Sequence, residues 1–312
     1  IVIYAVQFLA AMAGKKFVPG VMADANGSFI LLMLTMYGIS MPFMGWLVSR
    51  IPAQKIEGRK MTAGQWIIAF LMCYGLMYAG NLIGTALTFG IGMVKGTGVD
   101  NPMLSAAMEL NPWVTFVIAV LIAPTAEELL FRKLLTERIV KYGELAAVLA
   151  SGLFFGLFHG NLNQFSYAFL LGLFLGFIYV KTGKLGYTIG LHMAINFIGS
   201  SLGTWMLRVT GYMDTMETLT EFLNTRNLTV LGDLGNGIVG MFIFGSYASL
   251  ILMMAGAGLI LMWLNRKKFV CCAPAEKVAS LGKKKVAVMI GNPGILLYGA
   301  FWIGIMIWQL LQ

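Results

Sequence analysis

The sequence predicts an all-α fold, a polytopic integral membrane helical bundle with about eight or nine transmembrane or re-entrant helices. Of the 312 residues, 59% are hydrophobic and only 11% are charged, whereas soluble domains average about 45–50% and about 25%. The mean hydropathy is +0.82. The apolar stretches are long and continuous, which favours membrane-spanning helices over a barrel with alternating strands of about ten residues. This composition excludes a disordered chain, and three cysteines without a regular spacing exclude a disulfide scaffold.

Nine apolar segments are the expected elements of this bundle. A membrane span needs about 20 residues, so 144–159 and 165–180 are short. We expect these two to be re-entrant, with the polar sequence GNLNQ between them lining a wet cavity, where irregular backbone is tolerated. We expect one integral membrane domain over 1–312, with a motif-bearing catalytic core at 112–207. The nine segments are 1–14, 28–49, 65–93, 112–131, 144–159, 165–180, 185–207, 237–264 and 295–312.

The basic residues predict the orientation of the chain. Seventeen of the 22 lysines and arginines lie in the alternate loops 50–64, 132–143, 181–184 and 265–294. The positive-inside rule places these loops, and the N-terminal end of the sequence, in the cytoplasm of a multi-pass cell-membrane protein. The same distribution explains the net charge of +9. We therefore expect the lipid bilayer, and no nucleic acid, as a partner; the oligomeric state is left open.

Two acidic residues lie where membrane topology does not require charge. Glu127 and Glu128 end an apolar run, and a charge at membrane depth is costly unless it is paired or hydrated. An ordinary helix end explains part of this, because Glu128 and Arg132 are spaced i, i+4 as in a surface ion pair. Adjacent side chains on a helix diverge by roughly 100°, so one glutamate can pair with Arg132 while the other faces elsewhere.

Both histidines of the chain also lie within apolar segments. His159 closes the run LASGLFFGLFH, and His192 lies in YTIGLHMAINF, with Asn196 four residues later on the same helical face. A lone buried histidine is usually structural, but here two polar groups, spaced i, i+4, point in one direction. This pattern suggests a polar site inside the membrane.

Simple depth arithmetic brings these groups to one level. If the helix from 112 continues to a turn at Gly143, Glu127 and His159 each lie 16 residues from that turn, about 24 Å along the helices. An antiparallel hairpin would place them opposite each other. His192 lies eight residues beyond Lys184, about 12 Å from its own cytoplasmic turn. We therefore expect one layer of polar groups near the cytoplasmic side.

A carboxylate beside an imidazole can hold and deprotonate a water molecule. Glu127, His159 and His192 could equally be ligands for zinc, which keeps an open position for water. A carboxamide such as that of Asn196 is a good donor to a developing oxyanion. The combination suggests a hydrolytic site for an amide within the membrane.

Three motifs carry a resemblance to a known family. EELLFR (127–132) fits EExxxR, FGLFH (155–159) fits FxxxH, and HMAIN (192–196) fits HxxxN. In this order they resemble the CPBP intramembrane proteases, also called the Abi or type II CAAX prenyl endopeptidase family. The resemblance covers about 115–205 and implies a helical intramembrane endopeptidase that cleaves a membrane-associated peptide or protein.

The resemblance also implies roles for individual residues. Glu127 would activate the water, His159 would help to hold it, and His192 and Asn196 would stabilise the oxyanion. The supporting residues Glu128 and Arg132 would orient the helix and the first glutamate. Zinc is one cofactor that this site could use, whereas a glutamate-activated water needs none, so the choice between a metalloprotease and a glutamate-type protease is left open.

Two other classes of function stay open at this point. Intramembrane glutamate and histidine often mark ion paths, and GNLNQ resembles the break in a transporter helix, so a proton- or ion-coupled transporter is an alternative. A non-catalytic immunity or scaffold protein could use the same fold. The sequence does not indicate the substrate, the cleavage site or whether the substrate is prenylated.

Overall fold

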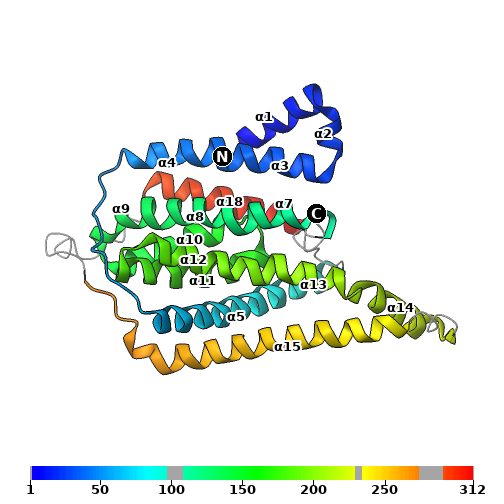
Figure 1. Ribbon diagram of the computed structural model, residues 1–312. Helices are drawn as coiled ribbons and strands as arrows, with labels where there is room; N and C mark the ends of the chain where they lie inside the picture. Colours follow the sequence, from blue (N-terminus) through cyan, green and yellow to red (C-terminus); the bar gives the residue numbers. More distant parts are fainter. Residues whose placement is uncertain (1, 97–107, 229–233, 274–290, 312) are drawn as a thin grey trace.

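The computed structural model describes residues 2–96, 108–228, 234–273 and 291–311, and the regular elements in these ranges are all helices (Figure 1). This confirms the all-α prediction. Six of these helices are long and apolar enough to cross a membrane, so the protein is a multi-pass membrane protein. The expected total of eight or nine transmembrane or re-entrant helices is thus confirmed only in part. The six are Ala25–Ser49, Ala63–Lys95, Pro112–Tyr142, Leu162–Thr182, Gly237–Lys268 and Pro293–Leu311.

The remaining predicted segments form helices of other kinds. The first is α1 (Val2–Phe17), of 16 residues, and α10 (Glu144–Phe158) has 15, both shorter than a span. The stretch predicted at 185–207 is one continuous helical run, made of α12 (Leu185–Asn196), η5 (Phe197–Leu202) and α13 (Gly203–Val209).

One prediction was wrong: the segment 165–180 is not a short re-entrant piece. It belongs to α11 (Leu162–Thr182), whose 21 residues are enough to span a membrane. The helix begins early because the Asn161 side chain accepts a hydrogen bond from the backbone N–H of Gln164, an N-cap that takes Leu162 to Gln164 into the first turn. Of GNLNQ, only Gly160 and Asn161 therefore remain in the connection.

The helix Pro112–Tyr142 continues through the charged sequence to Gly143, as predicted. Gly143 has φ 110°, which a residue with a side chain rarely adopts, so the chain turns there and α10 returns alongside. Wide π turns interrupt the α-helix on both sides of Glu127 and Glu128. The successive segments are α7 (Pro112–Thr115), η2 (Phe116–Ile122), α8 (Ala123–Glu128), η3 (Leu129–Thr136), α9 (Glu137–Ile139) and η4 (Val140–Tyr142).

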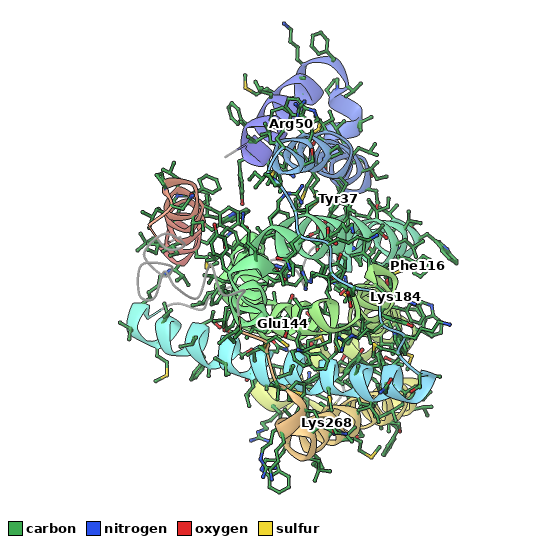
Figure 2. The ribbon with its side chains drawn as sticks, turned by 90° about the vertical axis from the view of Figure 1, so that its left-hand side faces the viewer. Tyr37, Arg50, Phe116, Glu144, Lys184 and Lys268 are labelled. Atoms are coloured by element: carbon green, nitrogen blue, oxygen red, sulfur yellow. The ribbon has the colours of Figure 1, made fainter. Side chains whose placement is uncertain are left out.

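Most of the helices lie roughly parallel in layers (Figure 1), whereas α5 crosses the others at an angle (Figure 2). α10, α11 and α12 form the centre, α5 and α15 cover one side, and α8 with α18 covers the other, with the N-terminal helices outermost. Small residues let the central pair approach closely, because a Cβ added to Gly172 would lie 2.9 Å from the Cα of Gly152. The further bounds are α2 (Pro19–Ala23), α3 (Ala25–Thr35), η1 (Met36–Ser40), α4 (Met41–Ser49), α5 (Ala63–Lys95), α14 (Tyr212–Thr225), α15 (Leu234–Asn265), η7 (Arg266–Lys268) and α18 (Pro293–Leu311).

An extended strap, residues 51–62, links α4, the last of the N-terminal helices, to α5. Its backbone N–H groups bind three elements of the bundle, α9, α11 and α12. Together these bonds fix the strap across one end of the helix that carries EELLFR, of α11 and of the helix that carries HMAIN. Gln54 donates to the Glu137 carbonyl at 2.7 Å, Arg59 to the Thr182 carbonyl at 2.6 Å, and Met61 to the Tyr187 hydroxyl at 3.0 Å.

Candidate active site

The two adjacent glutamates of α8 are buried and have different partners. Glu128 is fully buried, with Oε2 lying 3.0 Å from Arg132 Nε and Oε1 lying 3.0 Å from His192 Nδ1. Glu127, with 7% of its surface exposed, turns away from this ion pair. The expectation that one glutamate pairs with Arg132 while the other faces elsewhere is therefore confirmed.

His192 lies between the two carboxylates. A carboxylate only accepts hydrogen bonds, so the Nδ1 atom that faces Glu128 carries the hydrogen. The opposite ring atom, Nε2, lies 3.9 Å from Glu127 Oε2. That separation is too long for a direct hydrogen bond, but a water molecule can bridge two polar atoms at this distance. His192 is thus oriented by one glutamate and directed at the other.

His159 is held at the end of α10 by a backbone contact. Its Nδ1 lies 2.9 Å from the Phe155 carbonyl oxygen. Because a carbonyl only accepts, Nδ1 carries the hydrogen, and Nε2 of the neutral ring keeps its lone pair. His159 also contacts the Tyr167 ring, with centroids 6.3 Å apart. The free lone pair can accept a hydrogen bond from water.

The ring of Phe155 joins these groups. It is 1% exposed, and its centroid lies 4.9 Å from that of His159 and 5.5 Å from that of His192, both in edge-on contacts. The Arg132 guanidinium carbon lies 4.6 Å from the same ring centroid, a cation–π contact that stabilises a desolvated charge. The phenylalanine of the FxxxH motif therefore packs the two histidines and the arginine into one cluster.

Asn196 follows His192 by one turn, but its amide is committed to the backbone. Its Nδ2 donates to the Ala119 carbonyl at 2.8 Å. That carbonyl lacks its usual helical donor, because the Ala123 N–H bonds to Ile118 instead and Pro124 has no N–H. Asn196 thus ties α12 to η2 at a place where the π turn leaves an acceptor without a helical partner.

The sequence did not suggest Tyr37, which the structure places in the site. Its hydroxyl donates to Glu127 Oε1 at 3.1 Å, which leaves Oε2 directed at His192. Tyr37 comes from η1 and lies between the N-terminal helices and the rest of the bundle (Figure 2). The available signal was weak: a tyrosine hydroxyl within an apolar span needs a polar partner.

The histidines have the arrangement that metal-ligating histidines adopt, with Nδ1 hydrogen-bonded and Nε2 free. However, no three His, Cys, Asp or Glu side chains within the described ranges form a group that could hold a metal ion. Glu127, His159 and His192, predicted above as ligands that zinc could use, form no such group. We therefore derive no step through a metal.

The structure brings most of the predicted residues together. Three are in direct contact, Glu127 faces His192 across 3.9 Å, and His159 joins them through the Phe155 ring. Asn196 lies on the same helix as His192 and binds the backbone of η2. The three residues in direct contact are Glu128, Arg132 and His192.

A comparison with protein-family models found a match over residues 109–198, to the family described as type II CAAX prenyl endopeptidase Rce1-like. The matched range contains all six predicted site residues. No curated protein and no solved structure matches the chain.

Proposed function

Because the chain belongs, through residues 109–198, to the Rce1-like type II CAAX prenyl endopeptidase (CPBP) family, we propose that it is an intramembrane endopeptidase. In this proposal it hydrolyses a peptide bond of a membrane-associated peptide or protein. The family is one of hydrolases, and the six apolar helices agree with catalysis in a membrane. The observation that carries the proposal is the position of His192, between the carboxylates of Glu127 and Glu128.

In the proposed reaction, Glu127 is the general base. Tyr37 holds Oε1, so Oε2 is free to take a proton from a water molecule beside His192. His159 Nε2 accepts the second hydrogen of this water and orients its oxygen towards the substrate carbonyl. The oxygen then attacks the carbonyl carbon, and the proton held by Glu127 passes to the leaving amine. Positioned proton transfer of this kind contributes about 10²–10⁴-fold to a rate.

The oxyanion that forms in this step needs donors. We assign this role to His192, protonated at Nε2 and held by Glu128 at Nδ1, and to the second amide hydrogen of Asn196. Glu128 and Arg132 support the site, because their ion pair fixes the acceptor that orients the His192 ring. The reaction in this form uses side chains of the chain alone.

We also propose that the site opens towards the cytoplasm. The strap 51–62 and the turn at Gly143 lie at the same end of the central helices, since Gln54 bonds to Glu137 near that turn. Loops at this end carry most of the lysines and arginines, and basic residues concentrate in cytoplasmic loops.

The proposal is tested with purified protein in liposomes that contain a library of single-span peptides, with the products identified by mass spectrometry. Glu127→Gln should abolish cleavage, because an amide cannot accept the proton. Glu217→Gln is the control, since Glu217 is exposed on α14, outside the matched range. Cleavage by Glu127→Gln at the wild-type rate would refute the assigned base. An ion flux across the liposomes that Glu127→Gln removes, without any proteolysis, would favour the transporter instead.

A further inference from the structure

An apolar cavity of about 580 Å³ lies between the N-terminal span and the motif-bearing helix. One wall is formed by α3 and η1 and the other by α7 and η2. Apart from the Tyr37 hydroxyl and the Trp113 indole N–H, the side chains that line it are apolar. Its volume is typical of ligand-binding pockets in proteins.

The cavity is an open-sided groove and not a closed chamber. Four of its wall residues keep a large exposed surface: Leu34 60%, Trp113 75%, Val117 43% and Ile122 38%. In a membrane these surfaces face lipid. An occupant can therefore enter sideways from the bilayer.

The groove leads to the proposed base. Its second wall runs from Trp113 to Ile122, and the nine steps between these ten residues span about 13 Å along a helix. Ile122 is five residues before Glu127, and Tyr37, at the same end of the groove, donates its hydrogen bond to Glu127. An apolar group that fills the groove would place whatever follows it next to the Glu127 carboxylate.

At Gly38 another helix can approach the backbone of the groove closely. A Cβ added to Gly38 would have no other heavy atom within 4 Å, so the backbone of η1 is bare towards the groove. Within a membrane, burial of apolar surface gives no driving force, because lipid tails are equally apolar. Helices associate there through close van der Waals packing at small residues. A lipid chain that enters this open groove exchanges one apolar environment for another and gains little free energy. A helix that docks there gains close van der Waals packing.

From these observations we propose that the groove binds one face of a transmembrane helix of the substrate, with a small residue packed against Gly38. This deepens the proposed function and rests on it. The docked helix ends near Tyr37, and the bond to be cleaved lies just beyond it. The last carbonyls of a helix have no intrahelical partner, so the peptide there is accessible to the water that Glu127 activates.

The test is Gly38→Leu, which projects a side chain into the groove from a position where an added Cβ meets no other atom, and which exchanges glycine for a better helix former. Gly90→Leu is the matched control: Gly90 is exposed on α5 and also has open space at its Cβ. For a peptide with a transmembrane helix, Gly38→Leu should raise KM by about tenfold or more, with kcat unchanged. For a short peptide that contains the same cleavage site but no helix, both variants should match the wild type.

Three results would overturn the proposal. They are an unchanged KM in Gly38→Leu, an equal effect on the short peptide, or an effect confined to a short peptide with a lipid chain, which would make the lipid chain the occupant. If the wild type cleaves no peptide at all, the proposed function itself fails, so the two failures are distinguishable.

A second measurement does not depend on turnover. In the Glu127→Gln background, Leu34→Cys should form a disulfide with a cysteine in the substrate helix. Leu82→Cys, at a position 73% exposed on α5, should not. Equal cross-linking at both positions would show that the helix does not dock in the groove.

Discussion

Replacing Arg132 with methionine should destabilise the protein by about 3–5 kcal/mol, because it leaves the buried Glu128 carboxylate without its charge partner. Both side chains of this pair are 0% exposed, and the atoms lie 3.0 Å apart. The loss of the guanidinium contact with the Phe155 ring, at 4.6 Å, adds to the effect; such contacts reach about 2 kcal/mol when desolvated.

The chain contains a matched control on the same helix. Lys133 and Glu137 form an ion pair with the same i, i+4 spacing at 2.7 Å, but the Lys133 side chain is 42% exposed. Glu137 is 8% exposed, yet it also accepts a hydrogen bond from the Tyr179 hydroxyl at 2.9 Å, so it keeps a partner when Lys133 is removed. Exposed i, i+4 pairs contribute about 0.3–0.5 kcal/mol. Lys133→Met should therefore lower the free energy of unfolding several times less than Arg132→Met does, although each variant removes one cation.

The assay is reversible unfolding of the purified protein in mixed micelles with increasing sodium dodecyl sulfate, followed by circular dichroism. The double variant Glu128→Gln with Arg132→Met should be more stable than the sum of the two single losses predicts, because it leaves no unpaired charge. Two results would refute the view that Arg132 and Glu128 stabilise each other. One is a decrease in the free energy of unfolding below about 1 kcal/mol for Arg132→Met, and the other is a double variant whose decrease equals the sum of those of the two single variants.

Three further predictions follow from described contacts. Tyr37→Phe should lower kcat by about ten- to a hundredfold with KM unchanged, since a hydrogen bond to a charged group contributes about 1.5–3 kcal/mol. Tyr4→Phe, which removes a hydroxyl from the same N-terminal helices, should change neither. Burial acts to raise the pKa of Glu144, but hydrogen bonds from Lys181 and the Cys272 N–H outweigh it and hold this pKa below the usual 4.5. The stability that these bonds contribute is present above about pH 5 and is lost as the pH falls through the lowered value. The melting temperature of Glu144→Gln should therefore depend less on pH in this window than that of the wild type. Treatment with a chelator, checked by metal analysis, should leave proteolysis intact, because the proposed base is a carboxylate; loss of activity restored by added zinc would contradict this.

Much of the motif-bearing helix could be predicted because its signals are local. The apolar spacing before Gly143 and the i, i+4 relation of Glu128 and Arg132 are both properties of one continuous helix. The prediction for 165–180 failed for a physical reason: the expectation counted apolar residues, whereas the Asn161 cap allows polar residues to begin the helix.

The contacts between distant segments could not be predicted in this way. Tyr37 and Glu127 are 90 positions apart, and no pattern in either segment indicates the other. The Asn196 bond to Ala119 depends on a π turn that frees one carbonyl. Such partners become visible only when the path of the backbone is known.

The hydrogen bonds of the strap 51–62 have a consequence for how this protein could be divided. The segment shared with the family begins at residue 109, yet the strap ties the preceding chain to Glu137, Thr182 and Tyr187, and Tyr37 contacts the proposed base. The segment that matches the family is therefore shorter than the part of the chain that builds the proposed site. A chimaera that transplants only 109–198 into another membrane scaffold would inherit the acid, the imidazoles and the arginine, but it would leave behind the hydroxyl that orients the acid.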